Sequence, residues 1–555
     1  MRDKILDREI GSKGSNGSAL AALISVFFFW GFLAASNGIF IPFCKTHFHL
    51  SQFQSQLIDS AFYGAYFIGS LVLYLISMAI NRDIINRLGY KRTIIYGLLI
   101  SVIGALTMIP AVNSGSFGFI LGAFFIIALG FSLQQTSANP LVLNLGDVAR
   151  GSARLNFAGS VNSLGTTLGP ILVSLVLFGK MIATDADKQA ASINSINTLY
   201  VILAIAFGIA VLIMLVSRIP KLNIEEEDKE MKVLRAPMNF ILGILAVLIL
   251  IFCFFLYNTG YAIGFNGEDH SQFYFLTGFP VFLLIAFFIL LYQKRRIKAK
   301  NNFAAEVYPQ VTYGMIAIFV YVGVEVTIQS NMGTLLKHPD FGGLDDSQIA
   351  PFISLYWGSL MIGRWTGAIA TFKMSKTANT ILTLIVPFLA LSLVLFMNHL
   401  SGANVEQFYL YPVCVALLVA AFFMGRQKPA LTLLLFGSLG MIAMLVGLLT
   451  VGKVSVYAFL CGGLFCSIMW PCIFSLAIAG IGKYTGQASA FLIMMILGGA
   501  FIPPMQGLIA DKLDIHTSYI VPVFCFGFLA FYAWKVGRIL KKQGIDYDAN
   551  IEAAH

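Results

Sequence analysis

Long apolar runs separated by short polar segments dominate the chain. A helix needs roughly 20 apolar residues to cross the hydrocarbon core of a bilayer, and stretches of about that length recur from end to end. They predict sixteen transmembrane helices, near residues 19–44, 57–79, 93–111, 117–142, 155–178, 198–217, 238–257, 273–293, 310–331, 350–371, 379–398, 408–425, 429–451, 455–481, 487–510 and 519–537.

The polar breaks predict how these helices group. Residues 1–217 hold six spans, which we expect to form an N-terminal six-helix bundle. Residues 218–300 begin with a charged linker that includes the acidic run from Glu225 to Asp228 and continue with an extra helix pair. Residues 301–540 are expected to form a C-terminal bundle with an inserted helix pair within 379–451, and residues 541–555 a cytoplasmic tail.

Composition excludes a soluble enzyme. Apolar residues make up 58% of the 555 positions and charged residues 11%, whereas soluble domains average about 25% charged residues. The seven cysteines lie in or beside apolar runs, so we expect no disulfide framework. No GxxxxGK[ST] loop and no zinc-ligand spacing occurs, which disfavours ATP-driven transport and a metal cofactor. The net charge of +10 reports membrane sidedness and not nucleic-acid binding.

The Lys and Arg residues are distributed very unevenly between alternate loops. With the amino terminus inside, 29 of the 36 fall on the cytoplasmic side, six fall outside, and Arg364 lies within a span. Such an excess follows the positive-inside rule. It predicts an integral protein of a bacterial inner membrane with both termini in the cytoplasm.

Helix-breaking residues recur at matching places. Asn139–Pro140 in the fourth span corresponds to Trp470–Pro471, and Gly169–Pro170 in the fifth span corresponds to Gly498–Pro504. If the two extra helix pairs are set aside, these become helices four and ten, and five and eleven, of twelve. Matched interruptions in two repeats indicate a substrate site near the bilayer midplane. The alternative is that the helices bend only for packing.

Eight motifs carry a family resemblance. They are FFFWGFLAASNGIFIPF, AFYGAYFIGS, QQTSANPLVLNLG, RLNFAGSVNSLGTTLGP, YVGVEVTIQS, IGRWTG, SIMWPCIFSLAI and FLIMMILGGAFIPPMQG. The chain resembles the fucose permease and glucose/galactose permease family of the major facilitator superfamily. The resemblance implies a sugar importer driven by a cation gradient, with two six-helix bundles rocking around a central site. It does not extend to residues 238–293 or to one helix pair between 379 and 451.

Departures from the family pattern concern the coupling chemistry. The fucose permease pattern has Asn-Asp where this chain has Asn37-Gly38, and Glu-Thr where it has Gln135-Thr136. Gly159 replaces a Gln, while Asn162 is retained. Two expected proton carriers are therefore missing.

Glu325 is the strongest candidate to replace them. A charge at the centre of a membrane helix costs about 2.5–3.5 kcal/mol, so an acid there indicates function. Tyr321, Glu325 and Gln329 are spaced at i, i+4 and i+8 and share one helix face. We expect Glu325 to bind the coupling ion, as a proton carrier or a sodium ligand, and the resemblance to glucose/galactose permeases points the same way. The alternative is a protonated packing residue.

Two further charged residues lie in spans. Asp59, in the outer first turn of the second span, is a second candidate for cation coupling, with helix capping as the alternative. Arg364, near the inner end of its helix, is expected to lock the cytoplasmic gate or to extend to the membrane surface, in preference to binding substrate.

Amides and aromatic rings are the expected sugar contacts, because amides donate and accept hydrogen bonds and rings stack on the apolar sugar face. For each of them, hydrogen bonding between helices or packing is the alternative. The candidates are Asn37, Gln135, Asn139, Asn162, Thr166, Gln329, Trp30 and Trp470, with Tyr66 as a further aromatic.

The sequence therefore predicts a non-enzymatic importer of a hexose or deoxyhexose, coupled to a proton or sodium ion. It needs no other cofactor. Its partners are the sugar and the lipid bilayer, and the sequence gives no sign of an oligomeric state. The alternatives are a facilitative sugar uniporter or an exporter of larger glycans, and, from another class, a receptor or scaffold that does not transport.

Overall fold

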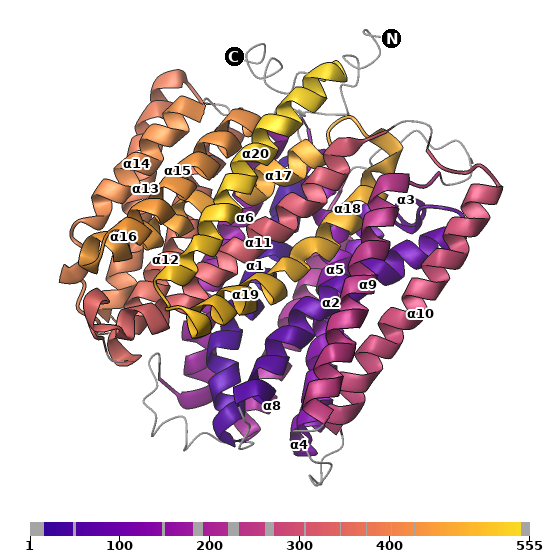
Figure 1. The fold of residues 1–555 in the computed structure, drawn as a ribbon, viewed down its shortest axis with the longest axis horizontal. Coiled ribbons are helices and arrows are strands. Elements are labelled where there is room, and N and C mark those ends of the chain that lie inside the picture. The colour runs from indigo at the N-terminus through magenta and orange to yellow at the C-terminus, as the bar shows by residue number, and fades with distance from the viewer. Residues whose placement is uncertain are drawn as a thin grey trace.

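The computed structural model describes residues 16–47, 52–146, 150–180, 193–219, 232–260, 271–304, 307–344, 346–372, 374–400, 402–425 and 428–545. Its helices lie side by side along one common direction (Figure 1). The first half contains α1 (Asn16–His47), α2 (Gln52–Ala79), the short α3 (Ile84–Leu88), α4 (Tyr90–Asn113), α5 (Phe117–Leu143), α6 (Gly151–Phe178) and α8 (Ile193–Val216).

The second half begins after an extra helix pair, α9 (Arg235–Gly260) and α10 (Ser271–Ala299). It contains α11 (Pro309–Lys337), α12 (Asp346–Ala368), α13 (Lys376–Leu400), α14 (Tyr411–Gly425), α15 (Pro429–Leu449), α16 (Gly452–Cys466), α17 (Met469–Ala477), α18 (Thr485–Met494), α19 (Gly498–Lys512) and α20 (Ile520–Lys542).

Each predicted span coincides with a helix or with a broken helix. Helices α16 and α17 together form one span and α18 and α19 another, and Pro471 lies in the first turn of α17, where proline needs no hydrogen-bond donor. Among the described residues, thirteen segments are long and apolar enough to cross a membrane, and α9, α10 and α12 supply the other predicted spans. The expected all-helical membrane fold is confirmed.

The two halves repeat one packing scheme. In the first half α4 packs against α5 and α8, α1 against α6, and α2 against α5. In the second half α15 packs against α16 and α20, α11 against α19, and α12 against α16. The same helix pairs therefore meet in the same order, which gives two six-helix bundles.

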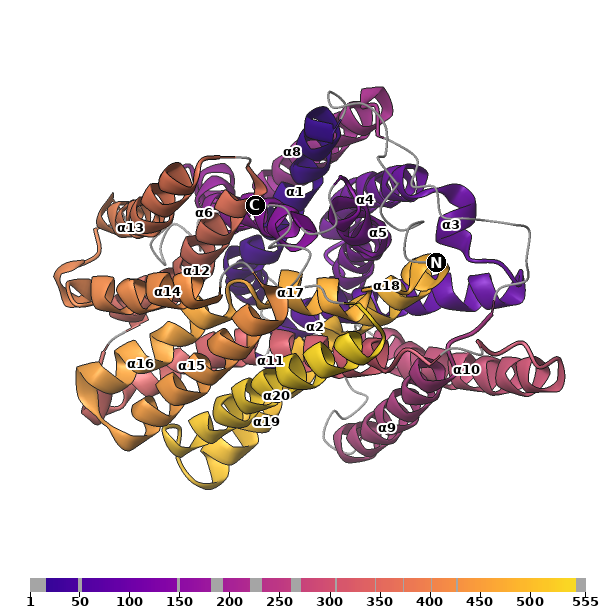
Figure 2. The same cartoon turned by 90° about the horizontal axis from the view of Figure 1, so that it is seen from above.

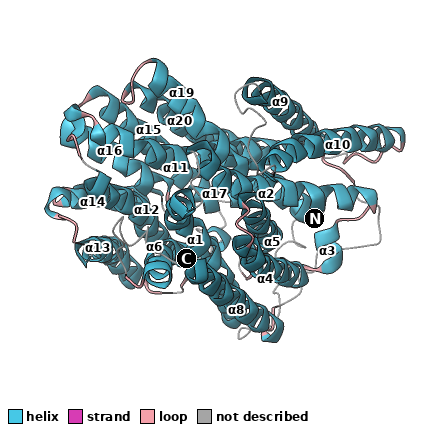
Figure 3. Ribbon diagram, turned by 90° about the horizontal axis from the view of Figure 1, so that it is seen from below, coloured by secondary structure: helices cyan, strands magenta, loops and turns pink. Residues whose placement is uncertain are grey.

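The extra helices lie at the periphery. Figures 2 and 3 show α9 and α10 at one edge and α13 and α14 at the opposite edge. The ends of the α9–α10 pair are joined by a hydrogen bond from the Val233 amide to the Asn302 carbonyl. The adjoining Leu234 amide donates to Gln487 Oε1 of α18 at 2.9 Å. This pair is thereby fastened to the C-terminal bundle.

The bundles are closed against each other at one end, where α2 ends and α18 begins. There the rings of Tyr74 and Phe491 meet with centroids 4.7 Å apart. Asn86 of α3 donates to the Lys483 carbonyl at 3.2 Å. At the same end α6 begins and α12 ends, and the rings of Phe157 and Phe372 lie 5.4 Å apart. We call this the closed end.

Candidate functional site

Glu325 of α11 meets Arg364 of α12 between the bundles. Their Oε1 and Nη2 atoms are 3.0 Å apart, and each side chain is 13% exposed. The Tyr321 hydroxyl donates to the same carboxylate at 2.8 Å. Because side chains lean toward the amino end of their helix, and consecutive α11 and α12 run in opposite directions, the two side chains lean toward each other.

Arg364 also contacts the N-terminal bundle. Its Nη1 donates to Ser163 Oγ of α6 at 3.0 Å and, over a longer 3.4 Å, to Asn162 Oδ1. Next to Arg364, the Trp365 indole N–H donates to the Ser160 carbonyl of α6 at 3.3 Å. The guanidinium therefore lies between the two bundles, and it does not extend along its own helix toward the membrane surface.

The break between α16 and α17 supplies another acceptor. Arg364 Nε donates to the Ser467 carbonyl at 3.2 Å, directly after the last residue of α16. The carboxyl end of a half-helix carries partial negative charge and stabilises a cation. Since Nη2 also lies 3.4 Å from the Tyr321 hydroxyl, all five N–H donors of Arg364 have acceptors.

The opposite charges of Glu325 and Arg364 compensate each other, and separating them costs free energy. Burying one charge without its partner costs several kcal/mol, so breaking such a pair destabilises a protein by about 3–5 kcal/mol. A proton or sodium ion that neutralised Glu325 would compete with Arg364 for the same carboxylate. This arrangement can sense a cation and can also hold the two bundles together.

A second polar group lies on α5 and α2. Gln135 Nε2 donates to the Tyr66 hydroxyl at 3.1 Å, and Asn139 Nδ2 donates to the Gln135 carbonyl at 3.0 Å. Asn139 is buried, and its Oδ1 has no hydrogen-bond partner within the part of the chain that the structure describes. A buried acceptor left unsatisfied is costly, so a donor such as a sugar hydroxyl would satisfy it.

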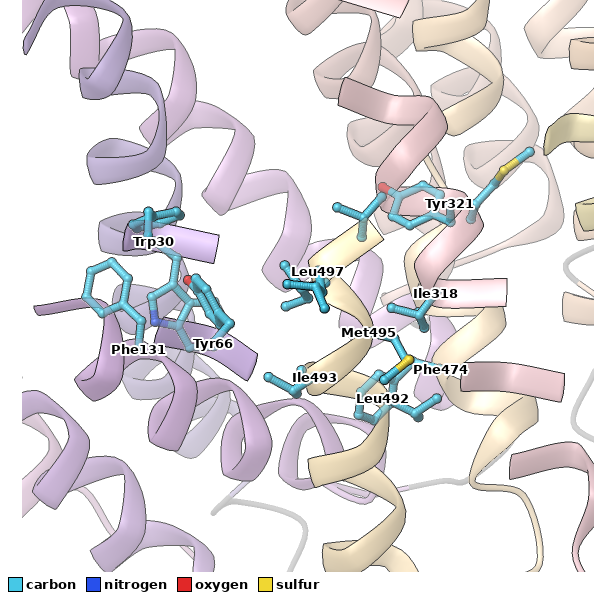
Figure 4. Close-up of a cluster of buried hydrophobic side chains, with 14 of the residues drawn as sticks. Trp30, Tyr66, Phe131, Ile318, Tyr321, Phe474, Leu492, Ile493, Met495 and Leu497 are labelled. Atoms are coloured by element: carbon cyan, nitrogen blue, oxygen red, sulfur yellow. The ribbon is translucent and has the colours of Figure 1, made fainter. Parts of the chain in front are cut away.

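Trp30 does not offer an exposed ring face on which a sugar could stack. It is 4% exposed, and its indole N–H donates to Gln134 Oε1 at 2.9 Å. Gln134 in turn donates to Ser101 Oγ at 3.1 Å. Figure 4 shows Trp30 beside Tyr66 and Phe131, with Leu497 between this group and Tyr321. Trp30 is therefore fixed within the N-terminal bundle in this conformation.

The remaining candidates divide between the two bundles. Asn162 Nδ2 donates to the Phe27 carbonyl of α1 at 3.0 Å, and Thr166 Oγ1 to the Ser163 carbonyl at 2.7 Å. The Trp470 ring lies 6.2 Å from that of Tyr321. The half-buried Gln329 donates to Ser330 Oγ at 3.0 Å.

The structure thus brings some of the predicted site residues into contact with one another, whereas others lie elsewhere. Glu325, Arg364 and Asn162 are joined by direct contacts, with Trp470 reached through Tyr321. Gln135 and Asn139 form the separate group on α5. The side chains of Asn37 and Asp59 lie outside the described residues. Within the described part of the chain, His, Cys, Asp and Glu form no group of three or more that could hold a metal ion.

Sequence reasoning missed Ser163 and the Ser467 carbonyl. Ser163 directly follows Asn162 and sits in a motif with several small polar residues, so its own spacing does not single it out. The Ser467 carbonyl belongs to the backbone. A helix break before Trp470–Pro471 was the available signal, because breaks expose carbonyls that intact helices use internally.

Comparisons with known proteins agree with the fold. The chain matches the family model of the Major Facilitator Superfamily over residues 19–425. It is 28% identical to a glucose/galactose transporter of Brucella abortus biovar 1, over 95% of this chain and 96% of the relative. It is 26% identical to the L-fucose-proton symporter of Escherichia coli (strain K12), over 96% of this chain and 95% of the relative. The resemblance seen in the motifs is confirmed.

Solved structures give the same result for the backbone. The transporter FucP in the outward conformation matches with a TM-score of 0.61 at 22% identity, over 93% of this chain and 98% of that one. The proton:xylose symporter XylE matches with a TM-score of 0.55 at 12% identity, over 95% of this chain and 96% of that one. At these identities the likeness shows the fold alone.

Proposed function

The chain belongs to the Major Facilitator Superfamily, and from that premise we propose that it imports a hexose or deoxyhexose by symport with a proton or sodium ion. The names of the relatives support the substrate class, since they include a glucose/galactose transporter and an L-fucose-proton symporter. The proposed location is a bacterial inner membrane, with both termini in the cytoplasm.

One observation supports the proposed coupling of sugar transport to a cation. Glu325 is a largely buried acid between the bundles, 3.0 Å from a cation that contacts both. When an external cation neutralises Glu325, the electrostatic attraction to Arg364 is lost. Because Arg364 spans the bundle interface, that loss alters how firmly the bundles are held together. An ion and a conformational change are thereby linked, as symport requires.

Sugar binding is proposed for half-buried amide side chains of the two bundles. Asn162 and Gln329 are half-buried amides on α6 and α11, and Gln135 is a half-buried amide on α5. Each amide offers donors and an acceptor that match sugar hydroxyls. The partnerless Oδ1 of Asn139 is a further acceptor in the Gln135 group. Trp470, beside Tyr321, is the proposed stacking ring. Trp30, Asn37 and Thr166 stay secondary candidates for sugar binding, and Asp59 stays a secondary candidate for cation coupling.

The closed end gives the proposed state of the transporter. If that end faces the cytoplasm, as the Lys and Arg distribution predicts, the described conformation is closed toward the cytoplasm. Alternating access would then consist of separating α2 from α18, and α6 from α12, at the closed end.

One alternative has a specific observation in its favour. Gly38 and Gln135 stand where the fucose permease pattern has carboxylates, which favours a uniporter that moves sugar without an ion. A receptor that binds sugar without transport is the alternative from another class.

Uptake into liposomes separates these functions. The purified protein would be reconstituted and tested with labelled glucose, galactose and fucose under separately imposed proton and sodium gradients. A symporter concentrates one of these sugars above its outside level only when the right gradient is present. Uptake that stops at equal concentrations would favour a uniporter, and binding without uptake would favour a receptor.

A further inference from the structure

The proposed transport cycle assigns no role to Ser163 of α6, although this residue contacts Arg364. It is 1% exposed, and its hydroxyl lies 3.0 Å from Arg364 Nη1. The neighbouring contact from Nη1 to Asn162 is 3.4 Å, which is long for a good hydrogen bond. Ser163 therefore makes the better of the two hydrogen bonds by which Arg364 reaches the other bundle.

We infer that Ser163 and Arg364 form a latch between the bundles, which ionised Glu325 holds shut and the coupling ion opens by neutralising Glu325. This inference rests on the proposed function, since it explains how the ion acts on the fold. Ser163 is a positioning residue here, because it acts through Arg364 and touches neither sugar nor ion.

The geometry of the guanidinium explains why Glu325 controls the latch. The group is planar and rigid, so the orientation of one side fixes the direction of the others. Nη2 is held by Glu325 Oε1 at 3.0 Å, and Nε is held by the Ser467 carbonyl at 3.2 Å. With these two contacts in place, Nη1 is directed at α6.

Loss of the charge on Glu325 would release one of those two supports. The charged hydrogen bond to a carboxylate is roughly twice as strong as one to a neutral acceptor. Without it, Arg364 is held mainly by the Ser467 carbonyl and can turn away from Ser163. The latch then opens, and α6 can separate from α12 at the closed end.

The latch explains why sugar alone would not cross. While Glu325 is ionised, the bond to Ser163 keeps the closed end shut, even with sugar bound. The groups that face Glu325 are Tyr321 from its own helix, Arg364 and Tyr356 from α12, and Cys466 from α16. Arg364 is the one cation among them, so its position responds most directly to the charge of Glu325.

Ser163→Ala tests the latch, and Thr167→Val is the matched control. Thr167 lies one turn further along α6 and also contacts α12, through Met361 Sδ at 3.6 Å, without touching Arg364. Ser163→Thr keeps the hydroxyl and should rescue the alanine variant. All variants would be reconstituted, and two activities measured: accumulation under the cation gradient and exchange of sugar without a gradient.

We expect Ser163→Ala to lower accumulation under the gradient but not exchange without it. Ser163→Ala should lower the accumulation ratio at least about fivefold while exchange continues, because sugar then leaks without the ion. Thr167→Val and Ser163→Thr should accumulate sugar like the parent protein. Equal accumulation by Ser163→Ala and Thr167→Val would overturn the latch, and so would a parallel loss of exchange and accumulation in Ser163→Ala.

A distance measurement tests the latch even if no sugar is transported. Spin labels at the exposed positions Arg87 and Lys483 flank the contact between α3 and the start of α18. In electron spin resonance, proton or sodium addition should lengthen this distance in the parent protein, and Ser163→Ala should be lengthened without the ion. An unchanged distance in Ser163→Ala refutes the latch. Failure of uptake with the expected distances would refute only the transport proposal.

Discussion

Replacing Arg364 by Gln removes the cation that faces Glu325 between the bundles. Both side chains are 13% exposed, so water can replace little of the lost interaction. The carboxylate keeps its bond from Tyr321 at 2.8 Å but loses its charged partner. Breaking a buried pair in this way costs about 3–5 kcal/mol, mostly because the remaining charge is uncompensated. Glu325→Gln should cost a similar amount, because Arg364 then remains charged.

The double variant Glu325→Gln/Arg364→Gln leaves no uncompensated charge. It should therefore be more stable than either single variant, which requires a coupling energy between the two sites larger than the cost of one single variant, about 3–5 kcal/mol. Thermal unfolding of the four proteins in one detergent measures the order, and Thr167→Val serves as a neutral control on the same interface. Additive losses, with the double variant the least stable, would refute the claim that the two groups compensate each other.

Three further predictions concern the packing around the site. Gly498→Ala should prevent stable folding, because an added Cβ would lie 1.8 Å from the Phe319 carbonyl oxygen. Expression levels and gel-filtration profiles measure this. A variant that expresses and elutes like the parent protein would contradict the close packing of α11 and α19. Trp30→Phe should lower stability by about 1–3 kcal/mol, since Gln134 loses a buried donor. It should leave the KM for sugar almost unchanged, and a large increase in KM would instead make Trp30 a sugar contact. Gln487→Leu should cost a similar amount by leaving the Leu234 amide without its acceptor. Thermal unfolding in detergent checks it, with an unchanged midpoint as the contrary result.

The sequence predicts the helices well because hydropathy is a local property. Every predicted span is helical in the structure, including the span broken before Trp470–Pro471. The boundaries shift by a few residues, as in α1, which begins at Asn16 and not at 19. Helices can extend past the hydrocarbon core into polar sequence, so a hydropathy run marks the core better than the helix end.

The site was less predictable because it depends on how helices are rotated against each other. Gln134 and Gln135 are adjacent, yet one binds Trp30 inside the bundle and the other binds Tyr66. Consecutive helical residues point about 100° apart, and one sequence cannot show which of the two faces the interior. Glu325 and Arg364 are 39 positions apart, and only the packing of α11 on α12 reveals their contact.

Glu325 is the residue through which we propose that a cation drives sugar import. The most direct measurement compares accumulation by the parent protein and by Glu325→Gln in liposomes, under the gradient that energises the parent. We predict that Glu325→Gln exchanges sugar across the membrane but no longer concentrates it. Accumulation by Glu325→Gln to the level of the parent protein would contradict the account.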